Sequence, residues 1–68
     1  MNRYQELLDL IQTFQKDFDK FFEKHNKSAG TRVRKHMATL KRKAQEIRNE
    51  VQEVKRKMDE EQGPTPSA

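Results

Sequence analysis

Apolar residues recur at alternating steps of four and three residues through the C-terminal half of the chain. The series consists of Val33, Met37, Leu40, Ala44, Ile47, Val51, Val54 and Met58. This heptad spacing, with no Gly or Pro inside it, is typical of a long helix that packs along another helix. We therefore expect a helix over about residues 27–61, with Met37 at heptad position a and Leu40 at position d.

The N-terminal third of the chain repeats the same spacing. Its series consists of Tyr4, Leu7, Ile11, Phe14, Phe18 and Phe21. A helix over about residues 2–24 is predicted, with Asn2 as its N-cap and Gln5 in position to complete a capping box. Leu8, Leu10 and Phe22 widen the apolar stripe, which indicates contact with more than one neighbouring helix.

Residues 25–31 interrupt both patterns and contain the turn. In one arrangement Asn26 caps the second helix, and Gly30 lies at an a position where the helices can approach closely. In the other, Gly30 lies in the loop and Thr31 is the cap. We favour the first because it keeps Asn26 and Gly30 on the seam, which is the line of a and d positions along the helix. Two prolines follow Gly63 and end the second helix, so residues 62–68 are expected to form a disordered tail.

These elements predict an all-α fold, in which residues 1–61 form an antiparallel, coiled-coil-like helical hairpin. The first helix would be roughly 35 Å long and the second roughly 52 Å, which leaves the far end of the second seam uncovered. With 31% hydrophobic residues and no Cys, one chain has a small core and no disulfides, so a homodimeric four-helix arrangement is expected. The expected core and dimer positions are Leu7, Leu8, Ile11, Phe14, Phe18, Phe21, Phe22, Val33, Met37, Leu40, Ile47, Val51, Val54 and Met58.

Basic residues gather beside the seam of the second helix. The e positions are Arg34, Lys41, Arg48 and Lys55, and the f positions are Lys35, Arg42, Asn49 and Arg56. Residues 24–45 hold eight Lys or Arg and no Asp or Glu, within a net charge of +4. Cations that recur about every 10 Å along a helix can follow DNA phosphates, with no obvious way to read bases. The candidate DNA-binding residues are Lys24, Lys27, Thr31, Arg32, Arg34, Lys35, Lys41, Arg42, Lys43 and Arg48.

Other chemistry is not indicated. We expect no catalytic residues, because there is no nucleophile–base pair, paired carboxylate site or Gly-rich phosphate loop, and hence no enzyme, cofactor or small-molecule substrate.

His25 and His36 lack carboxylate or thiol partners at ligand spacing, so no metal site is expected, and both are interpreted as polar edge residues. No apolar run approaches the roughly 18 residues of a membrane span, and no secretory signal is recognised, so a cytoplasmic protein is expected.

A resemblance to a known family lies in the turn and the second helix. It is carried by the segment Asn26-Lys27-Ser28-Ala29-Gly30-Thr31-Arg32-Val33-Arg34-Lys35, continued by Ala44-Gln45-Glu46-Ile47-Arg48. It resembles the bacterial histone-like proteins of the chlamydial linker-histone-like family, over roughly residues 24–57. The resemblance implies a small helical nucleoid protein that binds DNA with little sequence preference. Longer family members end in a Lys-, Ala- and Pro-rich basic tail. This chain has Gly-Pro-Thr-Pro-Ser-Ala instead, so binding is expected from the helical part.

Two functions of different class follow. The first is a histone-like architectural protein of the bacterial nucleoid that binds double-stranded DNA as a homodimer, with RNA as an alternative ligand. The second is a coiled-coil oligomerisation adaptor with no nucleic-acid role, whose charged flank is only solvated.

Overall fold

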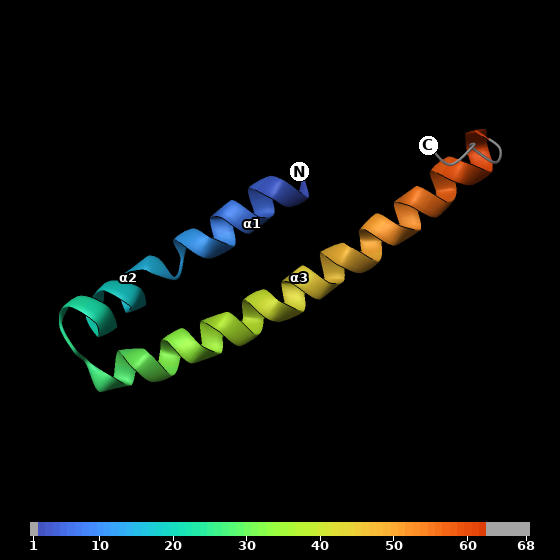
Figure 1. Cartoon of the computed structure of the whole chain (residues 1–68). Coiled ribbons are helices and arrows are strands. Elements are labelled where there is room, and N and C mark those ends of the chain that lie inside the picture. The colour runs from blue at the N-terminus through green and yellow to red at the C-terminus, as the bar shows by residue number, and fades with distance from the viewer. Residues whose placement is uncertain (1, 63–68) are drawn as a thin grey trace.

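The computed structural model describes residues 2–62, and this range is all-helical. Its elements are α1 (Arg3–Gln12), α2 (Gln15–Phe18), the π-helical turn η1 (Asp19–Glu23) and α3 (Lys27–Gln62). Figure 1 shows that α1, α2 and η1 lie along the first part of α3, and that the rest of α3 extends beyond them. The molecule is therefore a rod, with extents of 55 × 19 × 18 Å. The expected tail lies outside the described residues, except for Gln62, which is the last residue of α3.

The N-terminal segment, expected as one helix, is divided after Gln12. Asn2 caps α1 by accepting a hydrogen bond from the Gln5 N–H at 2.6 Å. At the other end, the Thr13 hydroxyl and N–H both donate to the Leu10 carbonyl, at 2.6 and 3.1 Å. The Phe14 N–H then bonds the Ile11 carbonyl at 2.9 Å, three residues back. This tighter turn separates α1 from α2.

The chain reverses direction through a wide turn at residues 24–26. The Lys24 N–H reaches the Asp19 carbonyl, five residues back, at 3.3 Å, which is the π-helical spacing. His25 follows in the left-handed conformation with φ 57°, and the Asn26 N–H bonds the Lys20 carbonyl at 2.9 Å. The Asn26 side chain then accepts from the Ala29 N–H at 3.2 Å. Asn26 thus caps α3, and Gly30 lies inside that helix.

The core lies beside this turn. Phe14, 4% exposed, and Ala29, 0% exposed, are the buried apolar residues in the described part of the chain. The Phe14 ring stacks on the His36 ring, with centroids 4.6 Å apart and planes inclined by 19°. Phe21 lies over Gly30 so closely that a Cβ on the glycine would be 2.6 Å from Phe21 Cε1. Small residues at positions 29 and 30 therefore allow the aromatic residues of η1 to approach α3.

The remaining apolar side chains are only partly covered in one chain. Leu7, Phe18, Val33, Leu40 and Ile47 are half-buried, whereas Leu8, Ile11, Phe21, Phe22, Met37, Val51, Val54 and Met58 are exposed. An open groove of about 570 Å³ is lined by Ile11, Gln12, Phe14, Gln15, Phe18, Met37 and Leu40. Over the described range, no helix is both long enough and apolar enough to cross a membrane.

Candidate nucleic-acid interface

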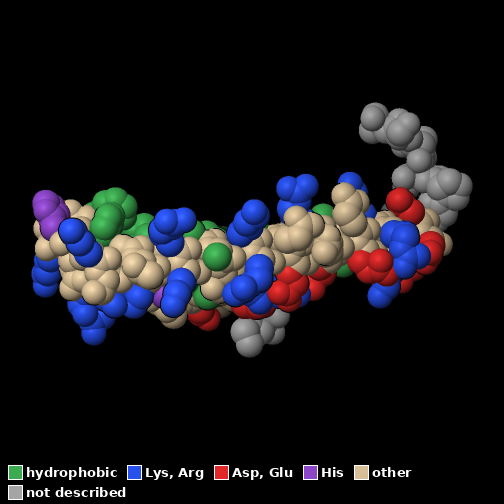
Figure 2. Space-filling view, turned by 90° about the horizontal axis from the view of Figure 1, so that it is seen from below, with side chains coloured by type: hydrophobic (Ala, Val, Ile, Leu, Met, Phe, Trp, Pro, Cys, Tyr) green, Lys and Arg blue, Asp and Glu red, His purple; other side chains and the backbone are tan. Residues whose placement is uncertain are grey.

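Most of the candidate cations lie on the outer face of α3 or on the adjoining turn. Lys24, Lys27, Arg34, Lys35, Lys41, Arg42 and Arg48 are exposed, as is Thr31. Within residues 2–61, none of these seven cations forms an ion pair. Figure 2 shows α3 from below, with Lys and Arg side chains spread along the helix and acidic side chains gathered toward its C-terminal part. The face that remains open to solvent is thus positively charged.

Arg32 and Lys43 differ from the other candidates because carboxylates of the N-terminal segment pair with them. Arg32 Nε donates to Asp17 Oδ1 at 2.8 Å, and Lys43 Nζ donates to Glu6 Oε1 at 2.6 Å. The pairing raises the pKa of Lys43, chiefly through the Glu6 hydrogen bond. Residues 24–45 are free of acids in the sequence, but the fold brings two acids to their inner flank.

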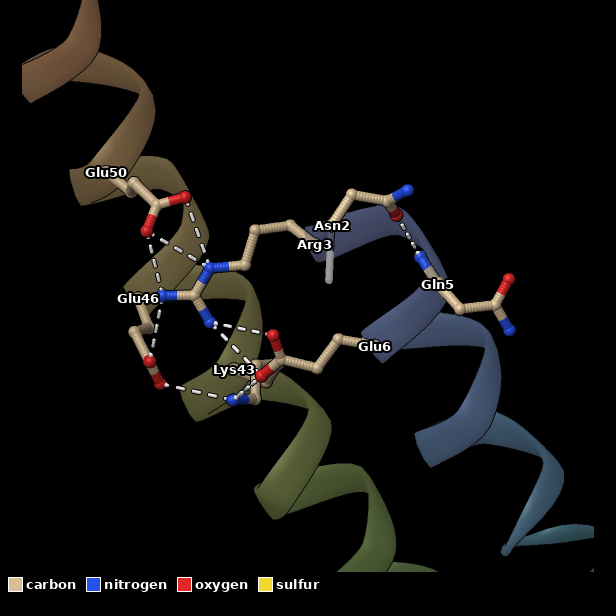
Figure 3. A network of polar contacts seen from close by, with 7 residues as sticks. All are labelled: Asn2, Arg3, Gln5, Glu6, Lys43, Glu46 and Glu50. Carbon is tan, nitrogen blue, oxygen red and sulfur yellow. Dashed lines mark hydrogen bonds and ion pairs between the residues drawn. The ribbon is translucent and has the colours of Figure 1, made fainter.

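A second cluster joins the start of α1 to the middle of α3 (Figure 3). The Arg3 guanidinium contacts Glu50 at 2.9 Å, Glu6 at 3.1 Å and Glu46 at 3.2 Å. These carboxylates raise the pKa of Arg3 further, with Glu50 making the largest contribution, and Arg3 lowers the pKa of Glu50. Lys43 completes the cluster through Glu6 and, at 3.5 Å, Glu46. The two cations and three carboxylates of this cluster join α1 to α3 at the point where α1 begins.

His36 is not the polar edge residue that the sequence predicted. Its ring is half-buried against Phe14, and its Nε2 lies 2.7 Å from Asp17 Oδ2. Arg32 and, to a lesser degree, His36 lower the pKa of Asp17 by hydrogen bonding to its carboxylate. Asp17 and His36 lie on opposite sides of the turn in the sequence. Their spacing predicts this contact only once the register between the two segments is known. Among residues 2–61 no His and carboxylate groups assemble into a cluster that could hold a metal ion.

The C-terminal part of α3 carries cations of a different kind. Arg56 pairs with Glu53 three residues before it and with Glu60 four residues after it, the latter at 2.9 Å. These contacts lower the pKa of Glu53 and raise that of Arg56. Positive charge here is largely neutralised by its own helix, in contrast to the first part of α3.

Comparison with known proteins supports the resemblance carried by the turn and the start of α3. The family model described as histone H1-like protein Hc1 matches residues 1–57. No curated protein and no solved structure matches the chain. The family match confirms the resemblance seen over residues 24–57 and extends it through the whole N-terminal segment. The chain therefore belongs to the family of histone H1-like proteins described as Hc1.

Proposed function

We propose that this chain is a histone-like architectural protein of the bacterial nucleoid, in the cytoplasm, that binds double-stranded DNA without sequence preference. The observation that carries the proposal is the set of exposed, unpaired cations along the outer face of α3 and its turn. Such cations attract the DNA backbone and release its condensed counterions, which favours binding to any sequence. Family membership supports the same function. Catalysis has no part in this activity.

The binding unit that we propose is a homodimer of antiparallel, coiled-coil-like helical hairpins. Its support is the apolar surface that one chain leaves open. Val51, Val54 and Met58 are 49%, 48% and 49% exposed, and Phe22 is 62% exposed. A second copy packed against these side chains would form a four-helix arrangement and would bring two basic faces into one molecule.

The same exposed apolar surface favours one other function, a coiled-coil adaptor that has no nucleic-acid role. In that case the cations of α3 only keep the chain soluble and influence the choice of partner. The two functions differ in their dependence on phosphate, so a salt titration of DNA binding separates them.

The test changes Arg34, Lys35, Lys41 and Arg42 together to Gln. Glutamine retains good helix propensity, and these exposed side chains make no ion pairs within residues 2–61, so helicity should be preserved. We expect a strong loss of affinity that is similar on unrelated DNA sequences, because phosphate contacts carry no base information. The slope of log affinity against log salt should flatten by roughly 0.9 for each phosphate contact removed. Fluorescence anisotropy at several salt concentrations measures both quantities.

The matched control changes Lys55, Arg56 and Lys57 to Gln. Arg56 is already paired with Glu53 and Glu60, so we expect a smaller loss of affinity than in the quadruple variant. A larger loss in the control would place DNA on the C-terminal part of α3. If neither variant changes binding, the charged face is a solvated flank and the adaptor function is supported instead.

A further inference from the structure

The outer face of α3 has a regular arrangement beyond its positive charge. Between the e and f rows runs the b row of the heptad, which consists of Thr31, Ala38, Gln45 and Gln52, all of them exposed. At 100° per residue, this row is the midline of the face turned away from α1 and α2. The midline is therefore uncharged and begins with two short side chains, while cations line both of its sides.

The two cation rows lie on opposite sides of this midline. Arg34, Lys41 and Arg48 line one side, and Lys35 and Arg42 line the other. Exposed b positions of a helix that is merely solvated have no need to be uncharged. Here the Lys and Arg side chains lie at the two edges of the outer face, and its centre is uncharged. The same turns of α3 carry no acidic side chain on this face.

We propose that α3 lies in the major groove of duplex DNA, with its two cation rows on the phosphates of the two strands and its uncharged midline toward the base edges. This inference rests on the proposed function and specifies the surface of DNA that it uses. A helix with its side chains is about 10–12 Å across, and the major groove is about 12 Å wide. Cations on both flanks then meet both groove walls, while Thr31 and Ala38 leave room at the floor.

The paired residues fix which side of α3 faces the DNA. Arg32 and Lys43 point toward α1 and α2, where Asp17 and Glu6 bind them at 2.8 and 2.6 Å. The N-terminal segment therefore lies on the side of α3 away from the groove. The midline stays uncharged through Gln52 and ends at Asp59, the next b position, whose carboxylate would face the negative potential of the groove. The second cation row is interrupted earlier, at Asn49, so the groove-binding part of α3 is its first half.

This placement distinguishes DNA from RNA. The major groove of an RNA duplex is deep and narrow and does not admit side chains for readout, so α3 cannot enter it. Thr, Ala and Gln on the midline can contact thymine methyl groups and adenine edges. They are too few to select a sequence, which agrees with binding to DNA of any sequence.

The experiment uses the full chain and four duplexes of one sequence, measured by anisotropy at one salt concentration. These are plain DNA, DNA whose cytosines carry glucosylated 5-hydroxymethyl groups, DNA saturated with netropsin, and duplex RNA. The glucose groups fill the major groove without changing the backbone charge, whereas netropsin occupies the minor groove of A·T tracts. We expect affinity for the glucosylated duplex and for RNA to fall by roughly tenfold or more, and the netropsin complex to change it by less than about threefold.

Each outcome decides the inference. Equal affinity for plain and glucosylated DNA, or loss of binding caused by netropsin alone, overturns the major-groove placement and leaves the proposed function standing. RNA bound as tightly as plain DNA also overturns it. Failure to bind any of the four duplexes overturns the proposed function itself.

Discussion

Asp17 connects α2 to α3 through one carboxylate. It accepts from Arg32 at 2.8 Å and contacts His36 Nε2 at 2.7 Å, and His36 in turn stacks on Phe14. Arg32 and His36 lower the pKa of Asp17, and Lys43 lowers that of Glu6. Because both carboxylates prefer the ionised form in the folded chain, they stabilise it at neutral pH.

This stabilisation should be lost in acid. The contribution of each carboxylate is complete above its ordinary pKa, 3.8 for Asp17 and 4.5 for Glu6. It disappears as the pH falls through the lower pKa of the folded state. We expect thermal stability followed by circular dichroism to decline as the pH is lowered below about 4. Asp17→Asn should flatten part of this pH dependence while lowering stability at neutral pH.

Asp9→Asn is the control for this prediction. Asp9 is exposed and accepts a hydrogen bond from the Gln5 side chain on its own helix, at 2.9 Å. Its substitution removes the same charge without touching α3, so the pH dependence should remain close to that of the wild type. If Asp17→Asn and Asp9→Asn behave alike, the contacts to Arg32 and His36 do not govern acid stability.

At the scale of the elements, periodicity predicts α3 well and the N-terminal segment less well. A single heptad series and the Asn26 cap are local features, and α3 is one uninterrupted helix over Lys27–Gln62. The N-terminal segment has an equally clear series, but it contains a tight turn at Thr13 and a wide one over Asp19–Glu23. Those turns depend on backbone hydrogen bonds and on the fit of the aromatic residues to α3, which apolar spacing does not encode.

The contact between η1 and α3 yields a prediction at Gly30. Alanine has a higher helix propensity than glycine by about 1 kcal/mol. Its Cβ, however, would lie 2.6 Å from Phe21 Cε1, so the ring must move. Overpacking costs about 1–3 kcal/mol, so Gly30→Ala should lower the free energy of unfolding by roughly 1 kcal/mol net. Chemical denaturation followed by circular dichroism measures the change.

The Phe21→Ala background separates the two effects. Without the ring there is no clash, and Gly30→Ala should then stabilise the chain by about 1 kcal/mol through propensity alone. A change of sign between the two backgrounds identifies the Phe21–Gly30 contact as the cause. The same effect in both backgrounds would show that the Phe21 ring readily moves away from Gly30. The close approach would then contribute nothing to the free energy of unfolding.

For the whole molecule, the sequence indicates which residues are basic but not which of them remain free. The e and f positions follow from the heptad, and they lie on the exposed face. The pairing of Arg32 with Asp17 and of Lys43 with Glu6 depends on the register between segments 15 and 37 residues apart. Register follows from the turn and from the Arg3 cluster, and neither is visible in the local pattern.

That register also determines how much of α3 one chain can cover. Arg3, in the first turn of α1, contacts Glu46 and Glu50. The N-terminal segment therefore begins beside the middle of α3 and covers only the part of α3 that precedes this point. The seam continues through Val51, Val54 and Met58, each about half exposed. The proposed homodimer makes this part of α3 the region where a second copy contributes most.

We therefore expect Val51→Gln together with Val54→Gln to weaken self-association without unfolding the protomer. Burying the exposed half of each valine contributes roughly 1 kcal/mol, and a symmetric dimer contains four such side chains. The dissociation constant from analytical ultracentrifugation should rise by roughly a hundredfold or more. Asn49→Ala with Gln52→Ala, at exposed polar positions of the same turns, should leave it unchanged. A wild-type chain that sediments as a helical monomer at micromolar concentration would exclude the homodimer, and the exposed seam would then belong to another partner.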